Sequence, residues 1–226
     1  MVPIDVLVHT TSQSRLRAVQ ELVVPFAHFA IEEPWNVPET CDRVKLRRAT
    51  DGEAARQETT AAMYFDDEIL TIVFAGVDDR VVATLLQHDA PLYKEDVVEV
   101  FLSPSRLEEY FEIEVNPLGT TFDARIESPD GVRATMKTDL AWTCEGLFAG
   151  VRRDGERFAV VIRIPFAALG RATPKEGETW RGNLFRVDRD PALGDDFLAW
   201  QPAKRTPPDF HVPAAFGILR FDRRNR

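Results

Sequence analysis

Cysteine, long apolar runs and positive charge are all scarce in this 226-residue sequence. Its two cysteines, Cys41 and Cys144, have no CxxC partner and no histidine at metal-ligand spacing, which excludes zinc-finger and thioredoxin-type sites. A single disulfide between them stays open as an alternative. No window approaches the roughly 18 apolar residues that a membrane-spanning helix needs, so we expect a soluble protein with no membrane partner.

Basic residues are outnumbered, because 28 Lys and Arg stand against 37 Asp and Glu and leave a net charge of −9. Binding to nucleic acid needs a coherent basic face, which this balance disfavours. The one basic cluster is the tail with Arg220, Arg223, Arg224 and Arg226, and we interpret it as a solvated terminus. The first residues lack a basic stretch followed by an apolar one, which predicts no secretion signal and, by default, a cytoplasmic location.

Apolar residues make up 44% of the sequence, enough for a sizeable core. They occur in short runs rich in Val, Ile and Phe, which is typical of strands. An Asp-Gly turn within 153–156 predicts a hairpin between 146–151 and 157–164. The same pattern predicts further strands at 60–65, 70–75, 97–102, 110–116, 183–189 and 216–221.

Close spacing of strands, with few helical patterns between them, predicts an all-β fold, an antiparallel β-sandwich with long irregular loops and few short helices. No repeat or linker divides the chain, so we expect a single domain over residues 1–226. The polar segments 36–58 and 188–213 are predicted to be long loops.

Two short departures from strand structure are expected. Leu16, Val19 and Val23 recur at helical spacing before Pro25, which predicts one helical piece. Residues 166–170 are expected to form a single turn.

Two predicted strands carry polar side chains on one face. Within 97–102 and 110–116, alternation points these residues to the core: Val98, Val100, Leu102, Phe111, Ile113 and Val115. The opposite face carries Glu99, Tyr110, Glu112, Glu114 and Asn116. Such a row is either the solvated outer face of a sheet or a binding surface, and a carboxylate flanked by apolar neighbours needs hydrogen-bond partners.

Several segments in series resemble carbohydrate-binding modules of family 9 and their relatives, over about residues 28–222. They are 92–102, 110–117 with Gly119 and Asp123, 164–166 with Leu169 and Gly170, 180–186, 198–202 and 210–221. The resemblance implies a β-sandwich that binds saccharides, typically at chain ends, between aromatic side chains. Calcium often has a structural part in that family, although the expected contacts require no cofactor.

Site residues follow from this resemblance position by position. It places the aromatic platform at Tyr93, an acidic hydroxyl acceptor at Glu99 and an amide at Asn116. Glu114 stands where binding members can have a basic residue, and Tyr93 stands where relatives commonly have Trp. The acidic row needs compensating charge, and we expect Arg186 nearby because a guanidinium pairs with carboxylates and donates to hydroxyls.

The long loop 188–213 is expected to close over one side of the site. Trp200, Phe210 and His211 are the candidates there for a second aromatic wall, and simple anchoring of the loop is the alternative. The acidic clusters at 66–68 and 78–79 match ordinary turn chemistry better than a calcium loop.

Two other functions stay open. A glycoside hydrolase would use Glu99 with Glu112 or Glu114, at carboxyl separations of about 5–5.5 Å for retention or 6.5–9.5 Å for inversion. A haem-binding sandwich would draw axial ligands from Met63, Met136, His88 and His211, whose spacing shows no link.

Overall fold

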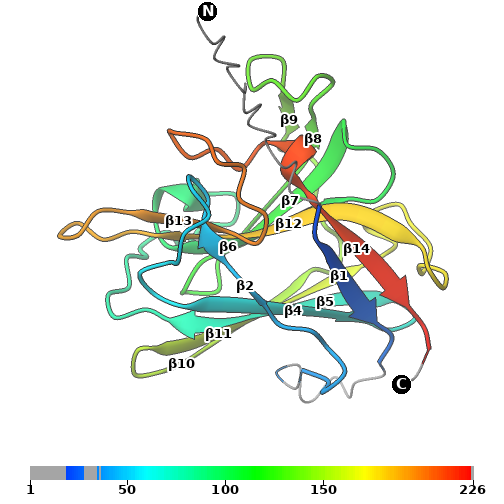
Figure 1. Ribbon diagram of the computed structural model, residues 1–226, viewed down its shortest axis with the longest axis horizontal. Coiled ribbons are helices and arrows are strands. Elements are labelled where there is room, and N and C mark those ends of the chain that lie inside the picture. The colour runs from blue at the N-terminus through cyan, green and yellow to red at the C-terminus, as the bar shows by residue number, and fades with distance from the viewer. Residues whose placement is uncertain (1–18, 28–34, 36, 225–226) are drawn as a thin grey trace, which may run out of the picture.

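The computed structural model describes residues 19–27, 35 and 37–224. These residues form two β-sheets packed face to face, together with two one-turn 3-10 helices (Figure 1). The predicted all-β sandwich is confirmed. No helix in the described part of the chain is long and apolar enough to cross a membrane.

The larger sheet has nine strands, and its main path runs β1-β14-β12-β6-β7-β8-β9. A short branch, in which β13 pairs with β12 and β3 with β13, completes it. Its strands are β1 (Glu21–Pro25), β3 (Arg47–Arg48), β6 (Val97–Ser103), β7 (Glu109–Val115), β8 (Thr121–Glu127), β9 (Lys137–Asp139), β12 (Thr179–Asp188), β13 (Asp196–Ala199) and β14 (Gly217–Asp222).

The smaller sheet has five strands in the order β10-β11-β5-β4-β2. They are β2 (Val44–Lys45), β4 (Thr59–Phe65), β5 (Ile69–Val77), β10 (Phe148–Asp154) and β11 (Arg157–Pro165). The predicted hairpin is β10 with β11, whose antiparallel register pairs Asp154 with Arg157. Residues 166–170 form the expected turn after β11.

The main core lies between the two sheets and follows the predicted alternation. The six inward residues of β6 and β7 are all buried in it: Val98, Val100, Leu102, Phe111, Ile113 and Val115. A second apolar cluster covers the outer face of the larger sheet, where Phe101, Tyr110 and Phe185 pack under loop residues such as Leu92 and Phe210. The larger sheet is therefore buried on both faces.

The helix predicted near the N-terminus is not found among the residues of that segment that the structure describes, 19–27. Residues 21–25 form β1, which pairs in parallel with β14, so the larger sheet is not wholly antiparallel. Leu22 and Val24 are buried at period two while Val19 is exposed, because the edge of β14 offers backbone partners that an isolated helical turn lacks. Leu16 lies outside the described residues.

Both long polar segments contain short strands. The segment 36–58 includes β2 and β3, and 188–213 includes β13. The 3-10 helices are η1 (Leu92–Lys94), directly before β6, and η2 (Pro213–Ala215), directly before β14. The turn η1 carries Tyr93 to the outer side of the larger sheet.

Candidate functional site

Three glutamates converge on the outer face of the larger sheet. Glu99 on β6 lies directly across from Glu114 on β7, and Glu112 is two residues from Glu114 on the same face. One carboxyl oxygen from each lies within 4.8 Å of the others. Their exposed fractions are 2%, 6% and 1% for Glu99, Glu112 and Glu114, so the carboxyl triad, as we call these three, is buried.

Burial of the triad overturns the interpretation of this face as solvated. The six core residues of β6 and β7 point inward as predicted, but loops cover the opposite face as well. Tertiary packing causes this burial. The turn η1 and the loop around Phe210 pack onto the apolar residues that surround the three carboxyls on the sheet. Strand alternation alone carries no information about such a cover.

The environment of the triad favours protonated carboxyls. Burial raises the pKa of Glu112 to about 7. The pKa values of Glu99 and Glu114 lie well above their usual range, first because both are buried and then because the neighbouring carboxylates repel added charge. At neutral pH the triad therefore shares protons.

Hydrogen bonding satisfies the triad only in part. Besides burial, the neighbouring Glu112 carboxyl raises the pKa of Glu114, and the Tyr93 backbone lowers it. Glu99 Oε1 and Glu114 Oε2 are buried without a hydrogen-bond partner among the described residues. Most buried polar atoms in proteins have a partner, so these two oxygens mark an unusual site.

Tyr93 lies beside the triad and faces outward. Its side chain is half exposed, with a residue exposure of 51%. Its backbone carbonyl accepts a hydrogen bond from Arg189 Nη2, and its backbone lowers the pKa of Glu114. The predicted platform therefore lies next to Glu114, the cross-strand partner of the predicted acid Glu99.

Asn116 is not free to contact a ligand as predicted. The residue is fully buried, its Nδ2 donates to the Leu85 carbonyl at 2.8 Å, and its Oδ1 accepts from the backbone N–H groups of Leu118 and Thr120 at 3.0 and 2.9 Å. Its position at the end of β7 turns the chain and holds the neighbouring loop. The amide is therefore a structural group in this arrangement.

Arg186 does not compensate the acidic row. On β12 it is paired with Val98, whereas its neighbour Phe185 is paired with Glu99, so period two sends Arg186 to the opposite face of the sheet. There its Nη2 lies 3.0 Å from Asp188 Oδ1 and 3.8 Å from Asp78 Oδ2. Arg186 belongs to a buried ion network between the sheets.

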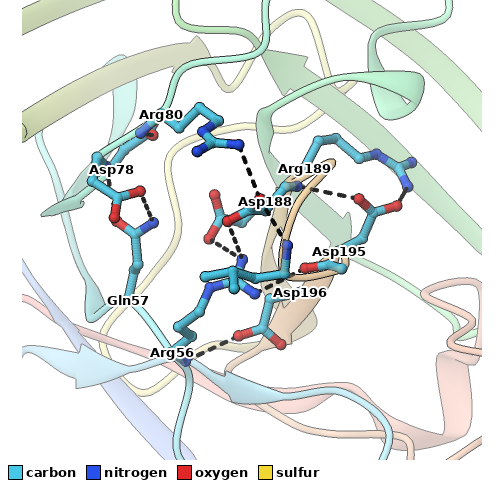
Figure 2. Close-up of polar contacts among 12 residues, drawn as sticks. Arg56, Gln57, Asp78, Arg80, Asp188, Arg189, Asp195 and Asp196 are labelled. Atoms are coloured by element: carbon cyan, nitrogen blue, oxygen red, sulfur yellow. Dashed lines mark hydrogen bonds and ion pairs between the residues drawn. The ribbon is translucent and has the colours of Figure 1, made fainter.

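This network extends to one end of the sandwich. Figure 2 shows Arg56, from the loop before β4, between Asp188 and Asp196. The Arg56 backbone N–H donates to Asp196 Oδ2 at 3.0 Å, and its Nη2 lies 3.5 Å from Asp188 Oδ2. Because arginines offset these aspartates, the network stabilises the loop ends without leaving an uncompensated charge.

Trp200 is also placed away from the predicted site. It is buried in the main core and packs across Gly217, so anchoring, the stated alternative, is its role. His211 does approach the triad, with Nε2 3.8 Å from Glu112 Oε1 and Nδ1 2.9 Å from the Tyr110 hydroxyl. Burial lowers the pKa of His211 to about 4, so it is neutral at pH 7 and supplies no charge.

Two residues near the site were missed by the sequence analysis. Arg189 links the Tyr93 carbonyl to Asp195, and Asp96 accepts the Arg189 and Val82 backbone N–H groups at 2.7 and 2.5 Å. Burial raises the pKa of Asp96 to about 6. Neither residue stands in a periodic pattern, and the position of Asp96 directly before a strand was the one available signal.

The alternative chemistries fit less well. For a glycosidase, the carboxyls of the triad belong to residues at most 6% exposed, whereas a catalytic pair has to flank the glycosidic bond that it cleaves. For haem, Met63 is buried in the main core, and Met136 and His211 both contact the Tyr110 hydroxyl. His88 lies elsewhere, against Thr121.

Calcium needs several oxygen ligands, and three groups of described residues bring such atoms together. One of them consists of Asp78, Asp96 and Asp188, but Arg186 and Arg153 already meet it, with Arg153 Nη1 3.3 Å from Asp78 Oδ2. A cation there would face guanidinium groups, so this group does not fit calcium. Asp66 caps its own turn by accepting from the Glu68 and Ile69 N–H groups, as turn chemistry predicts.

Both cysteines are buried free thiols, so no disulfide joins Cys41 and Cys144. Burial raises the pKa of each thiol to about 12, which leaves them unreactive at neutral pH.

Comparison with known proteins gave one family and a set of similar folds. The model of carbohydrate-binding family 9 matches residues 58–221. A putative carbohydrate-binding protein from Bacteroides uniformis is 19% identical, with a TM-score of 0.72 over 91% of this chain and 100% of that one. No curated protein matched the chain.

Modules of family 9 from Caldicellulosiruptor kristjanssonii are also similar. The structure in complex with cellotriose is 13% identical, with a TM-score of 0.65 over 91% of this chain and 95% of that one. The structure in complex with glucose is 14% identical, with a TM-score of 0.65 over 91% and 97% of the two chains. At these identities the likeness concerns the fold.

Proposed function

Because the chain belongs to carbohydrate-binding family 9, we propose that it is a noncatalytic protein that binds a saccharide at Tyr93 and the carboxyl triad. The matched region, residues 58–221, includes η1, β6 and β7, which together carry these residues. No catalytic family matches, which supports binding over hydrolysis.

One observation carries the proposal: an exposed aromatic side chain on η1 lies against the strand that carries buried carboxyl acceptors. Tyr93 is half exposed, η1 packs against β7, and the Tyr93 backbone is near enough to lower the pKa of Glu114. A pyranose ring stacks its C–H face on an aromatic ring, while its hydroxyls donate to carboxyl oxygens. The relatives in complex with cellotriose and glucose support saccharides as the ligand class.

Binding is expected to be weak. Each neutral hydrogen bond contributes only about 0.5–1.5 kcal/mol net, because water offers nearly equivalent partners. A few such bonds and one stacking contact give dissociation constants in the micromolar to millimolar range. A chain end is the expected epitope, as the resemblance to the family implies.

Tyr93→Ala tests the platform. We expect it to weaken binding of glucose or cellotriose by about 1–3 kcal/mol, because an aromatic anchor carries most of a small interface. Calorimetry on the wild type, Tyr93→Ala and Glu99→Gln measures this. Phe148→Ala is the matched control, because Phe148 is similarly exposed but lies on the smaller sheet.

Two results would contradict the proposal. Unchanged affinity in both Tyr93→Ala and Glu99→Gln would move the site elsewhere. Release of reducing sugar from an oligosaccharide by the wild-type protein would favour the glycoside hydrolase alternative instead.

A further inference from the structure

The carboxyl triad lacks a positively charged partner. Among the described residues, no ion pair includes Glu99 or Glu114, and the one cationic type near Glu112 is His211 at 3.8 Å, which is neutral at pH 7. Arg189 and Arg133 act on Glu99 only through space. The three acids on the outer face therefore have no counter-ion. The aspartates between the sheets differ in this respect, because Arg186 pairs with them.

Two orphan oxygens define what a ligand must supply. Glu99 Oε1 and Glu114 Oε2 are buried acceptors without donors, in residues that are at least nine-tenths buried. A neutral hydroxyl offers one donor and no charge. An ammonium group offers three donors and a positive charge, which matches three converging carboxyl groups.

The triad is also next to the one exposed aromatic side chain of the proposed site. Because η1 packs against β7 and the Tyr93 backbone lowers the pKa of Glu114, a sugar ring on Tyr93 lies beside that carboxyl. Arg189 donates to the Tyr93 carbonyl, so its guanidinium is occupied at η1.

From this arrangement, and resting on the saccharide-binding function proposed above, we propose that the site prefers an amino sugar, whose ammonium group binds to Glu99 and Glu114, over the neutral sugar with the same ring. The preference comes from charge, so it extends to amino sugars as a class. An N-acetylated sugar lacks the charge and gains nothing from the triad.

Binding of a cation to the triad is linked to protons. Burial and mutual repulsion raise the pKa values of all three carboxyls, so an arriving ammonium releases protons. The affinity for the cation therefore rises as pH rises through these pKa values. The other titratable or charged groups that face the triad are Arg189, Arg133, Asp209, Tyr110 and His211.

The experiment compares glucosamine, N-acetylglucosamine and glucose by calorimetry at pH 5.5 and 7.0. Over this range an amine that titrates near about 7.7–8 stays cationic. We expect glucosamine to bind about tenfold more tightly than glucose at pH 7.0, since hydrogen bonds to charged groups are the stronger ones. At pH 5.5 the difference should shrink, and heats in two buffers of different ionisation enthalpy should reveal proton release at pH 7.0.

Charge-neutral variants locate the effect. Glu114→Gln and Glu99→Gln keep the shape of the site and should remove the preference for glucosamine. Glu127→Gln is the matched control, because Glu127 is an exposed glutamate on the adjacent strand β8.

The outcomes separate this inference from the proposed function. Equal affinity for glucose and glucosamine overturns the amino-sugar preference and leaves saccharide binding intact. Absence of binding to any sugar overturns the proposed function itself. Competition of calcium with glucosamine, lost in Glu114→Gln, would assign the triad to a divalent cation and overturn the preference as well.

Discussion

Glu112 links the stability of the protein to pH. Burial raises its pKa from 4.5 to about 7, so between these values the folded state holds a proton that the unfolded chain has lost. The stability that this proton contributes is full below pH 4.5, falls as pH rises and is gone above about 7. One group shifted this far accounts for on the order of 3 kcal/mol.

Glu112→Gln should make the free energy of unfolding depend less on pH between 4.5 and 7, because glutamine is neutral over the whole range. Urea denaturation of the wild type and the variant between pH 4.5 and 8 gives the comparison. His211, whose pKa is depressed from 6.5 to about 4, acts in the opposite sense between these two values. Parallel profiles for wild type and Glu112→Gln would show that Glu112 titrates normally.

At the level of single residues, the sequence predicted which acidic side chains lie together, but it did not predict which groups surround them. Glu99 and Glu114 do lie together, because alternation places them on one face of adjacent strands. Arg186 was assigned by its charge, while its register with Val98 sends it between the sheets. Each face of β12 mixes apolar with polar residues, so period two could not show which face was the outer one.

The packing of Trp200, directly after β13, against β14 depends on a single glycine. A Cβ on Gly217 would lie 2.3 Å from Trp200 Cη2, and this tryptophan is buried in the main core. We expect Gly217→Ala to destabilise the fold by about 1–3 kcal/mol through overpacking. Chemical denaturation measures the change.

A double-mutant cycle identifies the cause. In a Trp200→Leu background the side chain that meets the new methyl group is shorter, so Gly217→Ala should cost clearly less there. An equal cost in both backgrounds would instead assign the effect to the backbone of β14.

Strands were more predictable than the segments between them. The hairpin of β10 and β11 and the faces of β6 and β7 follow from turn residues and alternation, which are local. The cover over the triad comes from residues far apart in the chain, such as Leu92 and Phe210, which no local pattern connects. The same holds for β1, whose strand conformation requires β14 as its partner.

For the molecule as a whole, we expect folding without a metal ion. The aspartates between the sheets are offset by Arg186 and Arg153, so they gain little from calcium. The melting temperature should therefore be the same in EDTA and in millimolar calcium. A ligand at a hundred times its dissociation constant would add about 2.7 kcal/mol, so a clear rise with calcium would reveal a structural metal site.

The parallel pairing of β1 with β14 has a mechanical consequence. Glu21 is paired with Ile218 and Pro25 with Asp222, so the chain enters this ladder at one end and leaves it at the other (Figure 1). A force that pulls β1 from Glu21 and β14 from Asp222 acts along the strands, so it loads all of their hydrogen bonds at once in shear. An antiparallel pair that is pulled apart from one end opens one hydrogen bond at a time instead. Single-molecule pulling should give one cooperative high-force rupture, and a series of small low-force steps would contradict it.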